Sequence, residues 1–330
     1  MEKTLYIFSS GELARKDNTL YFEVEASRRF IPVEDTCEIM IFGEVDVNKR
    51  LLEFLSQKEI ILHFFNYYGY YMGSFYPREH LNSGYMTLRQ SEHYLDEGRR
   101  LAIAKEFVRG AARNIRQVLK YYHGRDKNVS AKINAIENLI PPLEECKDTA
   151  ALMALEGNIR DHYFQTFDEI VGNPDFVFNE RSRRPPKNHM NTLISFGNSL
   201  MYTICLSEIY KTHLDPRIGY LHSTNFRRFT LNLDVAEIFK PIIVDRLIFS
   251  LVVKKMVTKD DFDRGTEGIM MKDGARKRFV EGLDEKLKTT INHREIGRPV
   301  SYRRLIRLEL YKLEKHLMGE KEYQAFVARW

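Results

Sequence analysis

The spacing of apolar residues changes once along this chain, and that change limits the folds that it can form. Before Pro77, short runs of β-branched and aromatic residues such as "TLYIFSS" and "TLYFEVE" are separated by turn residues, a pattern typical of β-strands. From about Leu88 onward, long segments such as "SEHYLDEGRRLAIAKEFVRGAARNIRQVLKYYH" carry apolar residues at helical spacing. The sequence therefore predicts an α+β protein. A small β-rich domain at residues 1–80 is joined to a large all-α domain at residues 81–330 by a linker near residues 77–88.

The β-rich part has a recognisable order of elements. Gly11 and the pair Asp17-Asn18 supply hairpin residues between the first two strands. "EIMIFG" follows as a third strand, and "IILHFF" and "YYMGSFY" as two more. Between them, "VNKRLLEFLSQKE" spaces its leucines as on one face of a helix. We expect these elements to form one small β-rich domain.

The overall composition is that of a globular protein. The chain has 330 residues, 43% of them hydrophobic and 29% charged, which gives ample material for a core. Its longest apolar stretch, "IIVDRLIFSLVV", is interrupted by Asp245 and Arg246, so no membrane span is predicted. The start "MEKTLYIFSS" lacks the apolar segment of a signal peptide, and Cys37, Cys146 and Cys205 lie far apart without paired metal spacing. We expect a cytoplasmic protein with reduced cysteines.

Charge is distributed unevenly between the two parts. Residues 1–85 carry nine Lys or Arg against thirteen Asp or Glu, a net charge of −4, whereas the remainder carries 42 against 33, a net charge of +9. This asymmetry favours a polyanionic partner on the second part alone. The sequence also lacks a phosphate loop ending in Gly-Lys, a G-x-G-x-x-G motif and a nucleophile elbow. These absences disfavour the usual ATPases, dinucleotide enzymes and serine hydrolases.

Three acids and one histidine stand out, although each has an ordinary explanation. Asp234 and Glu237 have the spacing of a capping box at a helix N-terminus, and a carboxylate in that first turn can also face a cation. His222 in "GYLHS" lies among apolar residues, where a histidine bonded to the backbone is the common case. Glu156 lies near the apolar side of a helical segment and has Arg160, four residues later, as a salt-bridge partner. Taken singly, none of these residues indicates a site.

Arginines are clustered in two places near these residues. Arg181, Arg183 and Arg184 precede two prolines that force an extended segment, and Arg227 and Arg228 follow the "GYLHS" segment. Each arginine alone is best explained as a solvated surface charge. As clusters they would favour contact with phosphate if a metal site lay beside them, because a guanidinium binds phosphate oxygens bidentately without reading the base sequence.

Taken together, four ordered segments resemble the CRISPR-associated adaptation integrases, the CRISPR proteins that insert new spacers. The segments are "LEGNIRDHYF", "RSRRPPKNHMNTLISFGNSLMYT", "GYLH" and "LDVAEIFKPIIVDR". The resemblance runs over the whole chain and includes the β-rich start and the tail "VSYRRLIRLELYKLEKHLMGEKEYQAFVARW". The combination is highly specific, although no one segment is.

The resemblance implies a metal site made by Glu156, His222 and Glu237. Many family members have aspartate at the last of these positions, so the glutamate here either reaches further or shares its role with Asp234. We expect Glu237 to be the direct ligand, with Asp234 beside it. Lys240 stands where related chains often carry arginine, which keeps the charge but loses the bidentate fork, and we expect it to join the arginines in binding DNA.

The resemblance also implies a function and its partners. The function is insertion of spacers into a CRISPR array, in which a DNA 3′-hydroxyl attacks a phosphodiester of the repeat. Two carboxylates and an imidazole make a mostly hard site that suits Mg²⁺ or Mn²⁺. The implied assembly is a homodimer joined through its β domains, bound to DNA and to the small second CRISPR-associated protein. Tyr163, on the same segment as Glu156, either orients a phosphate or packs in the core.

The sequence leaves two alternatives. One is a nucleic-acid-binding scaffold of the same family that has lost its chemistry, which the complete set of three metal ligands argues against. The other is an unrelated metallohydrolase acting on a small phosphoester, which would show little salt dependence in binding DNA.

Overall fold

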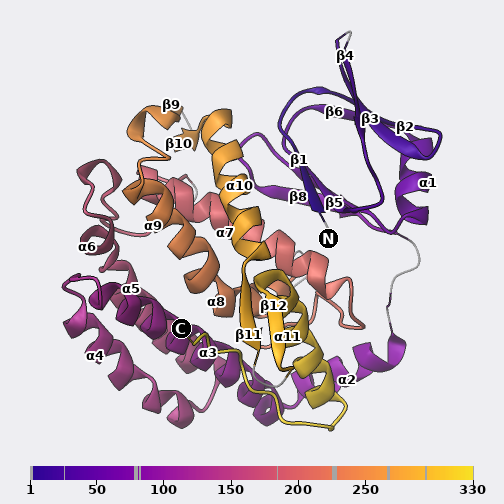
Figure 1. Ribbon diagram of the computed structural model, residues 1–330. Coiled ribbons are helices and arrows are strands. Elements are labelled where there is room, and N and C mark those ends of the chain that lie inside the picture. The colour runs from indigo at the N-terminus through magenta and orange to yellow at the C-terminus, as the bar shows by residue number, and fades with distance from the viewer. Residues whose placement is uncertain are drawn as a thin grey trace. The chain divides into compact units, whose positions relative to one another are not determined.

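The computed structural model of the chain (Figure 1) describes residues 3–25, 27–77, 81, 83–183, 185–224, 229–265, 268–293 and 296–329. The chain divides into two compact units, Met1–Leu81 and Asn82–Trp330, which are described separately. Strands predominate in the first unit and helices in the second, which confirms the predicted α+β class.

The first unit consists of two four-stranded sheets and one helix. One sheet has the strand order β1-β5-β7-β8, in which only the last pair is antiparallel. The other has the order β4-β3-β2-β6, in which β2 and β6 are parallel and the other pairs are antiparallel. The elements are β1 (Lys3–Ile7), β2 (Gly11–Lys16), β3 (Thr19–Val24), β4 (Ser27–Ile31), β5 (Thr36–Ile41), β6 (Val45–Val47), α1 (Lys49–Gln57), β7 (Ile61–Phe65) and β8 (Tyr71–Phe75).

The predicted turn residues Asp17-Asn18 form a hairpin, but it joins β2 to β3 and not the two predicted strands, because "GELARK" itself forms β2 and β1 pairs with β5. Lys16 pairs with Thr19, so the loop between β2 and β3 contains only Asp17 and Asn18. Asp17 has a φ of 54°, a conformation that Asp and Asn tolerate better than most residues and that two-residue hairpin loops require. Strands β2, β4 and β6 are additions to the predicted strands. Four of the five residues of β4 are exposed, so it lacks the apolar alternation by which a strand is recognised.

Apolar side chains from both sheets and from α1 form one core in this unit. Leu13 and Leu20 come from the second sheet, Ile39 and Leu62 from the first, and Phe54 from α1, and all are at most 1% exposed. Each sheet therefore buries one face, and α1 is held by the same apolar contacts.

The second unit is helical, with two short hairpins added. The hairpins pair β9 (Phe262–Gly265) with β10 (Gly268–Met271) and β11 (Thr290–His293) with β12 (Arg298–Ser301). They differ from the predicted all-α domain because strands of four residues are too short to show a two-residue period. The helices are α2 (Gly84–Leu95), α3 (Glu97–His123), α4 (Ser130–Leu139), α5 (Thr149–Phe164), α6 (Phe167–Val171), α7 (His189–Ile209), α8 (Leu231–Lys240), α9 (Arg246–Val253), α10 (Asp273–Lys288) and α11 (Tyr302–Leu317).

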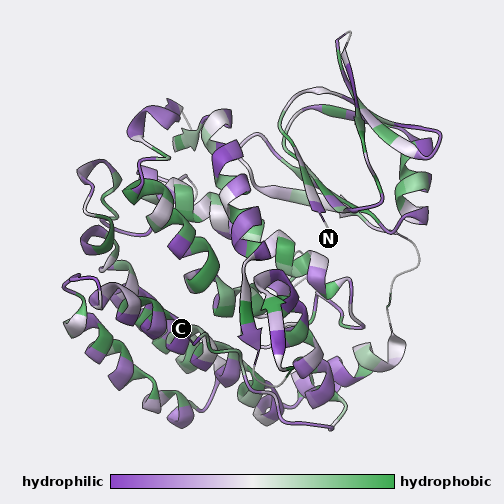
Figure 2. Ribbon diagram, in the orientation of Figure 1, coloured by the Kyte–Doolittle hydropathy of each residue, from purple (hydrophilic) through white to green (hydrophobic). Residues whose placement is uncertain are grey.

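Helices α7 and α8 are enclosed by the rest of the second unit. None of their residues is exposed, and both α3 and α7 pack against α8. The ribbons of α8 and α9 are largely green in Figure 2, as expected for helices surrounded by protein. The charged residues of α8 must therefore find partners inside the protein. Among the described residues, no helix is long and apolar enough to cross a membrane.

Pro241 interrupts the helix that continues from α8. It has no N–H to donate to the carbonyl of Glu237, four residues earlier, and a π-helical turn, η3 (Pro241–Asp245), connects α8 to α9. The carbonyl of Ile238 accepts a hydrogen bond from the side chain of Asn114 on α3, at 2.9 Å. The end of α8 is thus held by a side chain of a neighbouring helix.

Helix α7 approaches η3 closely at Gly197. A Cβ at this position would lie 2.5 Å from Val244 Cγ1 and 2.8 Å from Phe279 Cζ. We predict that Gly197→Ala lowers the free energy of unfolding by about 1–3 kcal/mol, because overpacking forces neighbouring side chains to move. The change in the urea midpoint of the second unit measures this effect.

Gly157→Ala on α5 is the matched control. No atom lies within 4 Å of a Cβ built at Gly157, so the variant should be neutral or gain up to about 1 kcal/mol from helix propensity. Equal effects of the two substitutions would contradict the close packing of α7 on η3.

Candidate active site

The buried carboxylate of Asp234 holds the segment that carries His222. Its Oδ2 accepts the N–H groups of Tyr220 and Leu221 at 2.6 and 3.0 Å, and its Oδ1 accepts the N–H of His222 at 3.0 Å. The same Oδ1 lies 2.7 Å from His222 Nδ1. A carboxylate on Nδ1 favours the proton there, which leaves Nε2 as the ring nitrogen suited to bind a metal.

This arrangement differs from the predicted capping box. Helix α8 begins at Leu231 with Thr230 in front of it, so Asp234 and Glu237 lie inside the helix and not at its N-cap and third position. Asp234 does not cap the helix, because its carboxylate accepts the N–H groups of residues 220–222, and the Thr230 hydroxyl likewise accepts a tertiary bond, from the N–H of Gly219 at 2.9 Å. The spacing of the two acids is therefore the spacing of one helical turn, and the capping interpretation is wrong.

Two residues position the His222 segment from outside α8. A Cβ at Gly219 would lie 2.8 Å from Asp234 Oδ2, so the segment can wrap around this carboxylate only with glycine there. Gln90 on α2 is fully buried, and it accepts the N–H of Asp215 at 2.7 Å and donates to its carbonyl at 3.1 Å. Neither role has a signal in the sequence, because both depend on contacts between distant segments.

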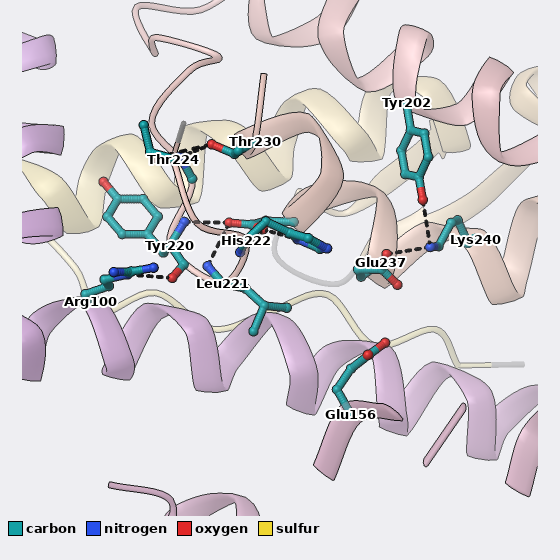
Figure 3. Close-up of polar contacts among 12 residues, drawn as sticks. Arg100, Glu156, Tyr202, Tyr220, Leu221, His222, Thr224, Thr230, Glu237 and Lys240 are labelled. Atoms are coloured by element: carbon teal, nitrogen blue, oxygen red, sulfur yellow. Dashed lines mark hydrogen bonds and ion pairs between the residues drawn. The ribbon is translucent and has the colours of Figure 1, made fainter. Parts of the chain in front are cut away.

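A single guanidinium joins the other two predicted ligands. Arg160 forms ion pairs with Glu156, one turn earlier on α5, and with Glu237 on α8. The side chains of the two acids are 19% and 6% exposed. Figure 3 shows Glu156 and Glu237 facing each other from their separate helices. The salt bridge expected from the spacing of Glu156 and Arg160 is confirmed, while the bond to Glu237 is a tertiary contact that the sequence does not reveal.

Lys240 brings a second buried cation to the site. Its Nζ contacts a carboxylate oxygen of Glu237 and lies 3.3 Å from the hydroxyl of Tyr202 (Figure 3). Burial lowers the pKa of Lys240 to about 8, and the charge of Arg160 acts in the same direction. Burial alone would raise the pKa of Glu156, but Arg160 and Lys240 hold it below its ordinary value. Glu156 is therefore ionised at neutral pH and is balanced by cations.

The donor groups suit a hard divalent metal, although cations engage them here. Two carboxylates and an imidazole nitrogen are appropriate for Mg²⁺ or Mn²⁺. The carboxylates of Glu156 and Glu237 converge on Arg160, and His222 lies close enough to influence the charge of Glu156. Within the described part of the chain, no three His, Cys, Asp or Glu side chains form a ready metal cluster. We attribute this to Arg160 and Lys240, which engage the oxygens that a metal would use.

The basic residues predicted to bind DNA lie in different surroundings. Arg181 is half-buried and donates to Asn191 Oδ1 at 2.8 Å and to Ser195 Oγ at 3.2 Å, and burial lowers its pKa to about 10. Arg183 is exposed, whereas Lys240 is buried within the site. Three of the predicted contacts fall outside the described residues: Arg184, Arg227 and Arg228.

Tyr163 packs in the core of the second unit. Its side chain is fully buried, and its ring makes an edge-to-face contact with Phe167 at a centroid distance of 5.1 Å. Burial raises its pKa well above the ordinary value. Of the two interpretations of this tyrosine, the structure supports packing.

The carboxyl-terminal segment is tied to α8 through α3. Asn114 on α3 is fully buried, and its Nδ2 donates to the carbonyls of Ile238 and Phe326 at 2.9 and 3.1 Å. Its Oδ1 accepts the N–H of Ala328 at 2.8 Å. The ring of Phe326 stacks on that of Phe239 with centroids 5.7 Å apart. The last residues of the chain thus help to fix the helix that presents the candidate acids.

We predict that Asp234→Asn destabilises the second unit by about 2–3 kcal/mol. The asparagine amide has an NH₂ group in place of one carboxylate oxygen, so it cannot accept all of the N–H groups of the His222 segment. Each hydrogen bond to a charged group contributes about 1.5–3 kcal/mol. Urea unfolding measures the change. The control is Asp273→Asn on α10, whose side chain is 65% exposed and which should stay within about 0.5 kcal/mol of the parent protein. An equal change in the free energy of unfolding for the two variants would contradict the role of Asp234.

Comparison with known proteins places these features in a family. Residues 5–285 match the family described as CRISPR associated protein Cas1. The chain is 62% identical over 330 residues to the CRISPR-associated endonuclease Cas1 2 of Thermodesulfovibrio yellowstonii, with both chains covered completely.

Solved structures agree with this match. A Cas1 protein from Thermotoga maritima aligns with a TM-score of 0.88 and 48% identity, covering 98% of this chain and 100% of that one. A chain of a Cas6-RT-Cas1–Cas2 complex shares the fold at a TM-score of 0.85 and 20% identity, covering all of this chain and 36% of that one. The chain therefore belongs to the Cas1 family of CRISPR-associated endonucleases.

Proposed function

We propose that this protein inserts new spacers into a CRISPR array as a metal-dependent DNA integrase and endonuclease. The observation that carries the proposal is the convergence of Glu156 and Glu237 on Arg160, beside His222, whose Nδ1 is bonded to Asp234. Membership of an endonuclease family supports it. The three proposed ligands come from α5, from α8 and from the segment before α8.

The proposed reaction exchanges one phosphodiester bond for another. The oxygen of a DNA 3′-hydroxyl loses its proton and forms a bond to the phosphorus of a repeat phosphodiester. The bond from that phosphorus to the 3′-oxygen of the repeat strand breaks, and the leaving oxygen takes up a proton as a new 3′-hydroxyl. The number of phosphodiester bonds is unchanged, so the reaction needs no nucleotide hydrolysis and no phosphate loop.

Glu156, Glu237 and Nε2 of His222 are the proposed metal ligands. When bound, Mg²⁺ or Mn²⁺ lowers the pKa of the attacking hydroxyl and neutralises charge on the phosphate. Asp234 keeps the proton of His222 on Nδ1 and fixes the ring, as carboxylates commonly do for metal-binding histidines. Lys240, beside Glu237, supplies a positive charge for the reacting phosphate.

The DNA is proposed to follow the basic part of the chain. The proposed phosphate contacts are Arg181, Arg183, Arg184, Arg227, Arg228 and Lys240, within the part after residue 85 that has a net charge of +9. Membership of the family supports three further proposals: a homodimer joined through the β-rich units, a complex with Cas2, and action in the cytoplasm, where the array lies. The solved complex that shares this fold is described as containing both Cas1 and Cas2.

Glu237→Ala should abolish strand transfer and leave DNA binding in EDTA intact. Loss of one metal ligand removes several kcal/mol of transition-state stabilisation, so the rate should fall by at least about 100-fold. The assay uses purified protein, with and without Cas2, and labelled branched DNA in Mg²⁺, Mn²⁺ or EDTA, with the exposed Glu281→Ala on α10 as control. An unchanged rate would remove Glu237 from the ligand set. Salt-sensitive binding without strand transfer by the parent protein in any metal would favour the scaffold alternative.

Arg227→Ala combined with Arg228→Ala should weaken binding to all DNA sequences. Each phosphate contact that is lost reduces the slope of log affinity against log salt by about 1, so a fall of about 2 is expected. The matched control is the double alanine variant of Arg28 and Arg29, an exposed arginine pair on β4. If the affinity and the salt slope of the first variant stay at those of the control, Arg227 and Arg228 are ordinary surface charges.

A further inference from the structure

Arg160 lies where a metal would be expected to act, and the family assignment of ligands does not account for it. It is the one side chain among the described residues that forms ion pairs with both Glu156 and Glu237. We propose that Arg160 is an internal counter-cation that competes with the divalent metal for these two acids, and that bound DNA relieves the competition. The inference rests on the proposed function and deepens it, because it makes metal binding and DNA binding depend on each other.

The burial of these groups makes Arg160 necessary in the metal-free protein. The side chain of Arg160 is 14% exposed, and those of Glu156 and Glu237 are 19% and 6% exposed. Two ionised carboxylates that face each other away from water repel and lose hydration, so they require a nearby cation. Burial disfavours the charge of Arg160 as well, but its pairing with Glu156 raises its pKa above the ordinary value. Arg160 therefore stays charged and holds the two helices together at this point.

The same contacts oppose a metal. Arg160 engages one oxygen of each acid, and Lys240 engages the other oxygen of Glu237. Two acids and two cations have formal charges that sum to zero, and the neighbouring pair of Asp245 and Arg181 adds no net charge. A divalent ion added to this group therefore creates an excess of two positive charges. In a buried site that excess is costly. A metal can bind tightly only if a cation withdraws or if an anion enters.

Arg160, more than Lys240, is the cation that decides this balance. Of the two acids, Lys240 contacts only Glu237, and its second partner is the hydroxyl of Tyr202 on α7. Arg160 bridges both acids, so a metal that takes both of them must displace it from both. No other described side chain has this position between α5 and α8.

A DNA phosphodiester supplies the anion that this arrangement lacks. A guanidinium binds phosphate oxygens bidentately, so a phosphate in the site gives Arg160 a replacement for the acids that the metal takes. DNA should then strengthen metal binding, and metal should strengthen DNA binding by the same factor. The metal-free protein keeps an assembled site, and the site binds metal tightly only when its substrate is present.

The test measures Mn²⁺ binding, which does not require the reaction to proceed. Free Mn²⁺ is titrated by its electron paramagnetic resonance signal in the full-length protein and in Arg160→Met, with and without branched DNA whose 3′-ends are dideoxy. In the parent protein, DNA should raise the affinity for Mn²⁺ by at least about 10-fold. Without DNA, Arg160→Met should bind Mn²⁺ at least about 10-fold more tightly than the parent, and DNA should add less than about 3-fold.

Two further variants separate the role of Arg160 from a general effect of losing an arginine. Arg109→Met is the matched control, because Arg109 bridges Glu106 and Glu144, which are not members of the proposed metal site, and it should behave as the parent protein. Arg160→Lys keeps a charge and should keep the weak binding of Mn²⁺. The melting temperature of Arg160→Met should be lower than that of the parent in EDTA and should recover in Mn²⁺. If Arg160→Met does not fold, Arg160→Gln replaces it with the same expectations.

Three results would count against the proposal in distinguishable ways. Equal or weaker Mn²⁺ binding by Arg160→Met without DNA would overturn the competition. If Arg160→Met binds Mn²⁺ more tightly than the parent but DNA still raises its affinity for Mn²⁺ as much as in the parent, the role of phosphate is wrong. Equal Mn²⁺ binding by the parent protein and by Glu237→Ala, with and without DNA, would overturn the metal site itself and with it the proposed function.

Discussion

Three carboxylates, two of them buried and the third, Glu156, partly buried, lie where α5, α8 and the segment before α8 meet, and the second unit must compensate their charges. Each would be unfavourable there without partners, because a buried charge loses its hydration. Asp234 is satisfied by three backbone N–H groups and the ring of His222. Glu156 and Glu237 are satisfied by Arg160 and Lys240. The contacts of Asp234 are fixed, since most of them are made with the backbone. The contacts of Glu156 and Glu237 are made with side chains, which can exchange one partner for another.

This difference explains why the acids are suited to different tasks. Asp234 cannot be freed without losing the fold of the segment around it, so it serves to hold His222 in place. Glu156 and Glu237 are held by cations alone, and a metal can replace cations without unfolding the backbone. The rest of the unit keeps α8 rigid while this exchange occurs. Asn114 ties its end to the carboxyl-terminal segment, Gly197 lets α7 pack against η3, and the π-helical turn at Pro241 sets the direction in which the chain leaves α8.

The sequence predicted what depends on local pattern and missed what depends on distant contacts. The α+β class, the turn at Asp17-Asn18 and the salt bridge between Glu156 and Arg160 all follow from spacing over a few residues, and all are present. The strand that enters this turn, β2, was predicted as part of the connection. The capping box failed because α8 begins one turn earlier than predicted and the carboxylate of Asp234 accepts the N–H groups of a distant segment, residues 220–222.

No pattern in the sequence indicates the residues that position the site, Gln90 and Asn114. Gln90 and Asn114 are single buried amides, and their importance comes only from the backbone groups that they reach more than a hundred residues away. The second contact of Arg160 is of the same kind, since the fold alone brings Glu237 to it. The two short hairpins in the helical unit lack a readable period for a different reason, which is their length.

The central claim is that Glu156, His222 and Glu237 bind one divalent ion. Crystals of the protein with Mn²⁺ and an unreactive branched DNA would test it most directly, because anomalous scattering locates manganese independently of any assumption about the site. The account predicts a manganese peak within bonding distance of both carboxylates and of His222 Nε2, with Asp234 still bonded to Nδ1 and Arg160 turned to a phosphate. A manganese peak elsewhere in the unit, with Glu156 and Glu237 still paired to Arg160, would contradict it.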